Sequence, residues 1–308
     1  MIDRREFLQL GSAAALSLAT AGVASCSPPG RRRFLRDYAP QLGMFRHHAG
    51  LDPLGEIRFL AAEGFRSIED TGLRAKPTAL QRQIGAELAR CGMTLACFTG
   101  VADFGRPTFA SGRRELRDDV LRQLRSAVDA AERVGARQLS IVPGRREPAV
   151  SPKEAERHAI DLLVRCADIC EPRGIMLLVE PVEHGSGSSR VFLRSARQAA
   201  AWCRAVRRPS CRVLVDLYQQ AVAGEDLPRL LSDVGDVLGH VQLGDFPGRR
   251  EPGTGELDFP KVFATLDAIG YRGALGMEHG VAGSGQAGER AVIDAYLALD
   301  RRAYRAIA

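Results

Sequence analysis

The sequence lacks the short motifs that mark several common ligand sites. None of its seven cysteines forms a CxxC pair, so the cysteine spacing does not predict a structural zinc site. No glycine-rich GxGxxG motif follows the first predicted strand, where residues 42–53 read LGMFRHHAGLDP. A doubly wound sheet that binds a dinucleotide is therefore disfavoured.

Basic charge is scarce in the main part of the chain. The formal net charge is +6, but residues 1–37 hold six arginines and three acidic residues. Residues 38–308 therefore carry only +3, and no basic block lies among them. This distribution argues against a nucleic-acid partner.

The first 26 residues have the features of an export signal rather than of a folded segment. Arg4 and Arg5 precede an apolar, alanine-rich run over about residues 8–24, which is short for a membrane span and interrupted by polar side chains. The segment resembles a twin-arginine signal, and the sequence VASC that ends at Cys26 resembles a bacterial lipobox. We expect export to the periplasm or cell envelope, with membrane contact only through the signal or a lipid on Cys26. An ordinary signal followed by a coincidental cysteine is the alternative.

The remaining chain divides into a short polar segment and a long domain. Residues 27–40 contain three consecutive arginines and are predicted to form a linker. Residues 41–308 are numerous enough for one large core and are predicted to form a single catalytic domain. The cysteines of this domain lie in apolar contexts and are interpreted as buried small side chains. They are Cys91, Cys97, Cys166, Cys170, Cys203 and Cys211.

Short apolar runs alternate with amphipathic segments along this domain. The amphipathic segments have helical spacing, and several end at a glycine in the position expected just past a helix. Eight such units, with strand runs that are apolar almost throughout, predict an α/β fold, a (β/α)8 TIM barrel. The predicted strands lie within residues 42–45, 65–73, 93–100, 136–144, 174–182, 211–219, 239–245 and 273–280.

Four consecutive predicted strands each carry an oxygen-bearing side chain near the C-terminal end. These side chains belong to Glu180, Asp216, Gln242 and Glu278. In a TIM barrel such strand ends meet at one mouth, where three carboxylates would repel one another and raise one another's pKa. A divalent cation between them is therefore expected, and oxygen ligands favour Mn²⁺ or Mg²⁺, with Co²⁺ or Zn²⁺ also compatible.

From about Leu42 onward the chain resembles the hydroxypyruvate isomerase family of xylose isomerase-like TIM barrels. The most specific match is residues 240–259, HVQLGDFPGRREPGTGELDF, which closely resembles the loop after the family's seventh strand. The resemblance implies that Glu180, Asp216, Gln242 and Glu278 are the metal ligands. It also implies that Glu180 and Glu278 act as acid and base on opposite sides of the substrate.

Two positions near these acids depart from the family pattern. Gln219 stands where a histidine is usual, and Glu183 stands where an asparagine is common. Both changes lie on the substrate side of the predicted pocket. They affect the expected substrate more than the expected metal site.

Several further polar residues are candidates for substrate contact. His47 follows the first predicted strand, and Arg249 could bind a carboxylate or phosphate, or else pair with acids of its own loop. His240 lies on the same face as Gln242 but two residues deeper, where a contact behind the ligand or a structural role is expected. Glu69, at the end of the second predicted strand, could accept a hydrogen bond from a sugar hydroxyl. The predicted substrate-binding set is His47, Glu183, His184, Gln219, His240 and Arg249.

The resemblance implies a divalent-metal-dependent isomerase of a small hydroxycarbonyl compound. The named reaction would convert hydroxypyruvate to tartronate semialdehyde, by proton transfer between neighbouring carbons through an enediolate. Because export does not suit that substrate, an exported keto-sugar epimerase or a keto-glycoside-processing lyase is an alternative. A non-catalytic binding lipoprotein is another alternative, against which the presence of both Glu180 and Glu278 argues. The expected partner is a small molecule, and a homo-oligomer is compatible with the sequence.

Overall fold

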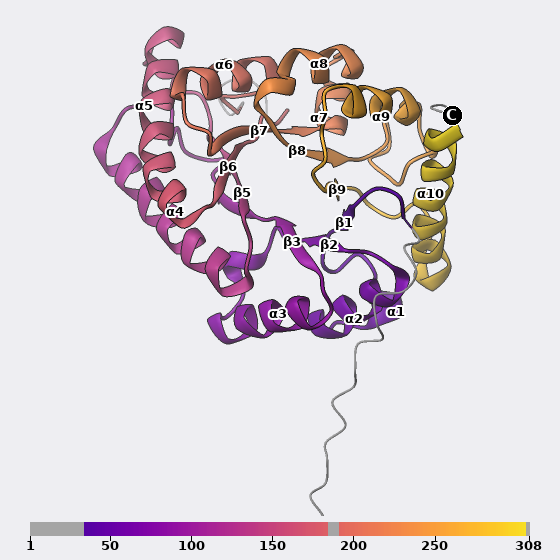
Figure 1. Cartoon of the computed structure of the whole chain (residues 1–308). Coiled ribbons are helices and arrows are strands. Elements are labelled where there is room, and N and C mark those ends of the chain that lie inside the picture. The colour runs from indigo at the N-terminus through magenta and orange to yellow at the C-terminus, as the bar shows by residue number, and fades with distance from the viewer. Residues whose placement is uncertain (1–33, 184–190, 306–308) are drawn as a thin grey trace, which may run out of the picture.

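A computed structural model describes residues 34–183 and 191–305 of the chain. Helices form a ring around a central set of strands, as Figure 1 shows. The predicted signal, the lipobox cysteine and most of the predicted linker lie outside the described residues. Within those residues, no helix has the length and apolar character that crossing a membrane requires.

The strands of the described residues are all parallel and form a barrel. One sheet has the order β1-β9-β8-β7-β6-β5-β4, and β2 pairs with β3. One residue separates β3 from β4, so the two segments together form one strand of the barrel. An isolated parallel bridge between Gln41 and Glu69 joins the chain after β1 to β2. The predicted (β/α)8 barrel is thus confirmed. The strands are β1(Tyr38–Pro40), β2(Ser67–Glu69), β3(Thr94–Cys97), β4(Thr99–Ala102), β5(Gln138–Val142), β6(Met176–Val179), β7(Cys211–Asp216), β8(Leu238–Leu243) and β9(Leu275–Met277).

The first strand lies earlier in the chain than predicted. Residues 42–45 form a turn instead, because Gly43 has a positive φ of 102° and the amides of Gly43 and Phe45 donate to the Glu56 carboxylate. Within the predicted linker, Tyr38 is 1% exposed and its hydroxyl lies 2.8 Å from Asp300 Oδ1. The placement of the first strand at residues 42–45 was therefore wrong, and the barrel includes the end of the predicted linker.

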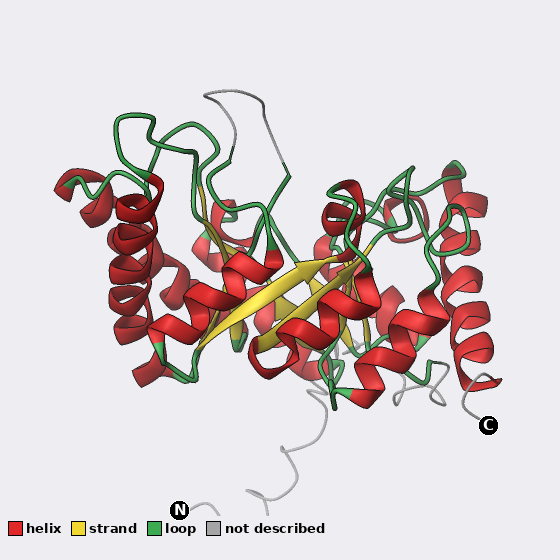
Figure 2. Ribbon diagram, turned by 90° about the horizontal axis from the view of Figure 1, so that it is seen from above, coloured by secondary structure: helices red, strands yellow, loops and turns green. Residues whose placement is uncertain are grey.

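Each strand except β3, which runs into β4, is followed by helical chain that covers the outside of the barrel, and Figure 2 shows the strands inside this cover. Several helices begin at a side-chain cap, including Ser151 before α5 and Asp258 before α9, which satisfies amides at the helix start. The α-helices are α1(Arg46–Ala49), α2(Pro53–Glu63), α3(Thr78–Arg90), α4(Arg114–Val134), α5(Pro152–Cys170), α6(Ala196–Val206), α7(Leu217–Val222), α8(Leu227–Val234), α9(Phe259–Ala268) and α10(Gly285–Arg305). Short 3-10 helices lie at η2(Leu73–Ala75), η3(Glu171–Arg173) and η5(Gly235–Val237).

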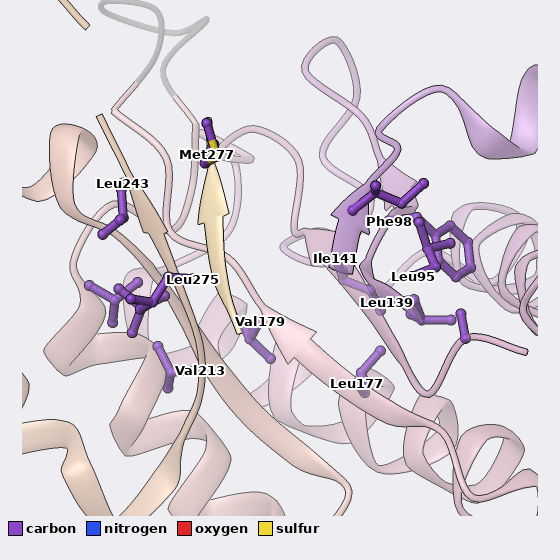
Figure 3. Packing of buried hydrophobic residues seen from close by; sticks show 14 of the residues in the cluster. Leu95, Phe98, Leu139, Ile141, Leu177, Val179, Val213, Leu243, Leu275 and Met277 are labelled. Carbon is purple, nitrogen blue, oxygen red and sulfur yellow. The ribbon is translucent and has the colours of Figure 1, made fainter. Parts of the chain in front are cut away.

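The strands are buried on both faces, as their apolar sequences predict. Leu177 and Val179 of β6 belong to the large core between barrel and helices, part of which Figure 3 shows. Leu178, between them, packs with Cys97 and Leu214 in a separate cluster. This inner cluster is apolar and lies on the opposite face of β6. All six cysteines of the domain are buried, and five of them, Cys97, Cys166, Cys170, Cys203 and Cys211, are free thiols, as their interpretation as small apolar side chains requires; Cys91 is disulfide-bonded and departs from it.

Candidate active site

The predicted acids meet at the C-terminal end of the barrel. Glu180 directly follows β6, Asp216 ends β7, and Glu278 directly follows β9. Gln242 of β8 lies between them, because it pairs in register with Asp216 on one side and with Gly276 on the other. A parallel sheet thus brings four residues that are far apart in the sequence to one level of the mouth.

The mouth is narrow at its base and widens outward. Glu180, Gln242 and Glu278 line a small cavity of about 30 Å³. A cleft of about 250 Å³ lies above it, lined in part by Glu278 and Arg249. A further pocket of about 580 Å³ shares residues with this cleft and contains His47. The space at the base is large enough for a single ion, whereas an organic molecule would lie in the cleft.

The three carboxylates strongly disfavour one another's ionised form. Burial and the nearby charge of Asp216 raise the pKa of Glu180 to about 7, and the hydroxyl of Ser140 offsets part of this. Burial raises the pKa of Asp216 to about 6, and Arg249 opposes the rise. Burial and the charges of Asp216 and Glu180 raise the pKa of Glu278 well above its usual value. Such a cluster requires positive charge to stay ionised at neutral pH.

Arg249 supplies one positive charge to the cluster. Its Nη2 lies 2.7 Å from Asp216 Oδ2 and 3.0 Å from Glu278 Oε1, and its Nε donates to the Glu278 carbonyl. The guanidinium also lies over the ring of Tyr218, 5.1 Å from its centroid. Arg249 has an unusual positive φ of 49°, so the loop must hold its backbone in place.

The loop that carries Arg249 is organised around a buried carboxylate. Asp245 is 1% exposed and accepts hydrogen bonds from the amides of Phe246, Gly253, Gly255 and Leu257, at 2.8–3.1 Å. At Gly255 a Cβ would lie 2.1 Å from the Phe246 carbonyl oxygen, so a side chain has no room there. The glycine-rich sequence after β8 therefore lets the loop fold back on Asp245 and present Arg249 to the acids.

A buried network that the sequence did not predict lies beside the ligand candidates. Glu69 accepts from His240 Nε2 at 2.5 Å, from Gln242 Nε2 at 3.1 Å and from Gln41 Nε2 at 2.8 Å. Glu69 and His240 are each 1% exposed. His240 is thus buried and bonded to Glu69, and it lines neither the small cavity nor the cleft, where a substrate contact was predicted. Glu69 contacts protein groups instead of standing open to a sugar hydroxyl, and only its strand-end position hinted at a role.

The donor set suits a divalent cation, although the geometry is not that of a preformed metal centre. Among the described residues no three His, Cys, Asp or Glu side chains stand at metal-binding spacing. However, Gln242 Oε1 is buried and has no hydrogen-bond partner in the described part of the chain. It accompanies three carboxylates whose pKa values are raised, and hard cations prefer such oxygens. These four residues fit a cation, provided that Arg249 yields its contacts with Asp216 and Glu278.

The other predicted substrate contacts have mixed positions. His47 lines the large pocket, but its Nδ1 lies 2.8 Å from Glu289 Oε1. Gln219 is 9% exposed, and its Oε1 accepts a hydrogen bond from the backbone amide of Glu183 at 3.0 Å. The Gln219 side chain therefore holds the chain after β6 in place. The Glu183 carboxylate pairs with Arg194. His184 lies outside the described residues.

Comparison with known proteins gives the same assignment by three routes. The family model described as xylose isomerase-like TIM barrel matches residues 57–299. A putative hydroxypyruvate isomerase of Xenopus laevis is 31% identical over 73% of this chain and 83% of its own length. A 2-oxo-tetronate isomerase of Cupriavidus necator is 27% identical over 77% of this chain and 89% of its own. The crystal structure of an AP endonuclease, family 2, from Brucella melitensis has a TM-score of 0.69 and 26% identity, over 82% of this chain and 96% of that one.

Proposed function

Because the chain belongs to the xylose isomerase-like TIM-barrel family, we propose that it isomerises or epimerises a small hydroxycarbonyl compound with the help of a divalent cation. The observation that carries this proposal is the cluster of three carboxylates with raised pKa values around the unpartnered oxygen of Gln242. A purely structural cluster would be expected to have its own donors. In this cluster Asp216 and Glu278 share the single guanidinium of Arg249, and Gln242 Oε1 has no donor among the described residues.

Glu180, Asp216, Gln242 and Glu278 would hold the cation at the base of the mouth. When bound, a divalent cation would polarise the substrate carbonyl and so acidify the neighbouring C–H group. Mn²⁺ or Mg²⁺ suits the oxygen ligands best. The small cavity that three of these side chains line limits the base of the mouth to one ion.

Glu180 and Glu278 would move the proton. They directly follow β6 and β9, on the two sides of the β7 and β8 residues, so a substrate between them has one carboxyl group on each side. One takes the proton from the carbon next to the carbonyl, the hydroxyl proton moves to the former carbonyl oxygen, and the enediolate is protonated at the former carbonyl carbon. The raised pKa of Glu180, about 7, suits both steps, because a carboxyl group that titrates near neutral pH both accepts and returns a proton readily.

Arg249 would bind the acidic or hydroxyl end of the substrate. It is the charged side chain that lines the cleft beside Glu278, and its guanidinium forms paired hydrogen bonds with carboxylates. This property supports hydroxypyruvate, which carries a carboxylate, with tartronate semialdehyde as the product. The relatives named as hydroxypyruvate and 2-oxo-tetronate isomerases support the same class of 2-oxo acid substrates.

A keto-sugar epimerase, or an enzyme that processes keto-glycosides, is a second candidate. The observation in its favour is the pocket of about 580 Å³ that adjoins the cleft and exceeds what a three-carbon acid requires. The same proton transfer would serve such a substrate. The two candidates therefore differ in what fills the outer pocket, and they share the chemistry at the base.

Proton exchange in D₂O tests the shared chemistry directly. The protein with Mn²⁺ or Mg²⁺ is incubated with hydroxypyruvate, a panel of ketoses or 3-keto-glycosides, and deuterium incorporation is followed by NMR or mass spectrometry. We expect exchange next to the carbonyl of at least one class, and loss of exchange on adding a chelator. No exchange with any of these compounds under either cation would overturn the proposal.

A further inference from the structure

The buried carboxylate of Glu69 has an unusual position relative to the proposed metal site. It lies at the end of β2, is 1% exposed, and lines the same small cavity as Glu180, Gln242 and Glu278. One of its oxygens accepts from His240 Nε2, and the other accepts from the amide nitrogens of Gln41 and Gln242. Glu69 is therefore surrounded by donors, and one donor belongs to a candidate ligand.

A glutamine ligand has a difficulty that a carboxylate ligand does not. Its amide has an oxygen at one end and an NH₂ group at the other, and the two orientations have nearly the same shape. Only the orientation with the oxygen toward a cation can bind it, because an NH₂ group has no lone pair to offer. Some other group must select this orientation.

Glu69 is placed to make that selection. The atom of Gln242 that faces Glu69 Oε2 at 3.1 Å is the NH₂ nitrogen, which donates to the carboxylate oxygen. The amide oxygen then points away from Glu69, and it is buried without a hydrogen-bond partner among the described residues. Gln242 lines the same cavity as Glu180 and Glu278, which places this oxygen among the candidate ligands.

We propose that Glu69 is a positioning residue that fixes the amide of Gln242 with its oxygen toward the cation. The inference rests on the cation of the proposed function. His240 serves the same end, because its hydrogen bond at 2.5 Å holds the other Glu69 oxygen. Gly276 makes the arrangement possible, since a Cβ there would lie 2.3 Å from Glu69 Oε1.

Substitution of Glu69 by glutamine gives a specific expectation. The new side chain has its own NH₂ group, which can donate to Gln242 Oε1 and so stabilise the reversed amide. Removal of an outer partner of a metal ligand typically weakens metal binding by about 10- to 100-fold. We expect a loss of that size in the Mn²⁺ affinity of Glu69→Gln, measured by titration calorimetry on the full-length protein.

The double variant separates positioning from a general structural role. A carboxylate at position 242 has two equivalent oxygens and needs no orientation, so Glu69→Gln should not weaken Mn²⁺ binding in the Gln242→Glu background. It should even strengthen binding there, because it removes a like charge beside the new one. If Glu69 merely supported the fold, its substitution would lower the Mn²⁺ affinity equally in both backgrounds.

Glu56→Gln provides the matched control. Glu56 is also a buried carboxylate, 3% exposed, and it accepts from the amides of Gly43 and Phe45 outside the metal site. This variant should lower the unfolding temperature without changing the Mn²⁺ affinity. Circular dichroism before each titration establishes that every variant is folded.

The outcomes distinguish this inference from the proposed function. Unchanged Mn²⁺ affinity in Glu69→Gln, or an equal loss in both backgrounds, would overturn the positioning role while leaving the isomerase proposal standing. If the unsubstituted protein bound neither Mn²⁺ nor Mg²⁺, the cation of the proposed function would fail, and the role of Glu69 with it. The inference would be supported if Glu69→Gln weakened Mn²⁺ binding in the protein that retains Gln242 but not in the Gln242→Glu variant.

Discussion

Two carboxylates near the barrel mouth, Glu289, which is buried, and Glu278, which is half-buried, have opposite surroundings. Glu289, on α10, accepts hydrogen bonds from the backbone amides and the Nδ1 atoms of both His47 and His48, at 2.7–2.9 Å. Although burial raises its pKa, these bonds outweigh burial, and the pKa lies below the usual value of 4.5. Glu278 has Arg249 as its charged partner and lies close to two other acids, which raise its pKa well above that value.

The difference indicates which carboxylate the fold uses for stability. Four dedicated donors are what a buried carboxylate needs to stay ionised without cost. Glu289 has them and joins α10 to the chain after β1. Glu278 lies among like charges, so its place in the structure costs stability that only a bound cation or substrate would return. The comparison therefore predicts that loss of the Glu289 charge lowers the free energy of unfolding, whereas loss of a charge from the cluster around Glu278 lowers catalysis and does not lower stability.

Loss of the Glu278 charge should have its largest effect on catalysis. Glu278→Gln removes a proton-transfer group, so the rate of deuterium exchange into substrate should fall by between about 100-fold and 10,000-fold. Exchange is measured at saturating Mn²⁺, so that weaker cation binding does not limit the rate. Glu115→Gln, on an exposed position of α4, is the control and should exchange at the parent rate. An active Glu278→Gln would show that the acid–base assignment is wrong.

Loss of the Glu289 charge should act on stability instead. An amide cannot accept all four hydrogen bonds, so Glu289→Gln should lower the free energy of unfolding by about 1–3 kcal/mol, as measured in urea. Because the pKa of Glu289 is lowered in the folded protein, this contribution is complete above pH 4.5 and disappears as the pH falls through the lower folded value. The difference in the free energy of unfolding between the variant and the parent should therefore become smaller below pH 4.5. A gap that is constant with pH would contradict the ionic explanation.

The smallest expected effect is on the free energy of unfolding, and its sign is opposite to that of Glu289→Gln. Without added cation, Glu180→Gln should raise the free energy of unfolding at pH 7 by about 1 kcal/mol, because it removes one charge from the crowded cluster. Mn²⁺ should reverse the order, since the parent has the better cation site. Urea titrations with and without Mn²⁺ test this reversal. Equal stability of both proteins under both conditions would remove the basis for the comparison.

The sequence predicts the barrel and the level of the acids well, because both depend on local patterns. Apolar runs of strand length indicate the barrel strands, and a carboxylate at the end of such a run must lie where the parallel strands end. The first strand was misplaced, since Tyr38–Pro40 is short and follows a segment of polar character. Its burial depends on contacts with residues near the C-terminus, such as Asp300, which no local pattern reveals.

The contacts within the site were harder to predict for the same reason. The sequence shows that Arg249 lies in a loop, but its contact with Asp216 depends on how the loop folds around Asp245. Glu69 and Gln242 are 173 positions apart, and their pairing follows from the closure of the barrel. The orientation of an amide cannot be read from a residue type at all. It becomes visible only when its neighbours are known.

The close approach at Gly276 has a consequence for how such proteins diverge. Because a Cβ at this position would lie 2.3 Å from Glu69 Oε1, an alanine at 276 would push the Glu69 carboxylate out of its present position. A lineage that gained the alanine would have to lose the glutamate in the same period, or pass through an intermediate with a displaced carboxylate. Descendants of this barrel that keep Glu69 in this position should therefore keep Gly276, whereas those that lose Glu69 are free to replace the glycine.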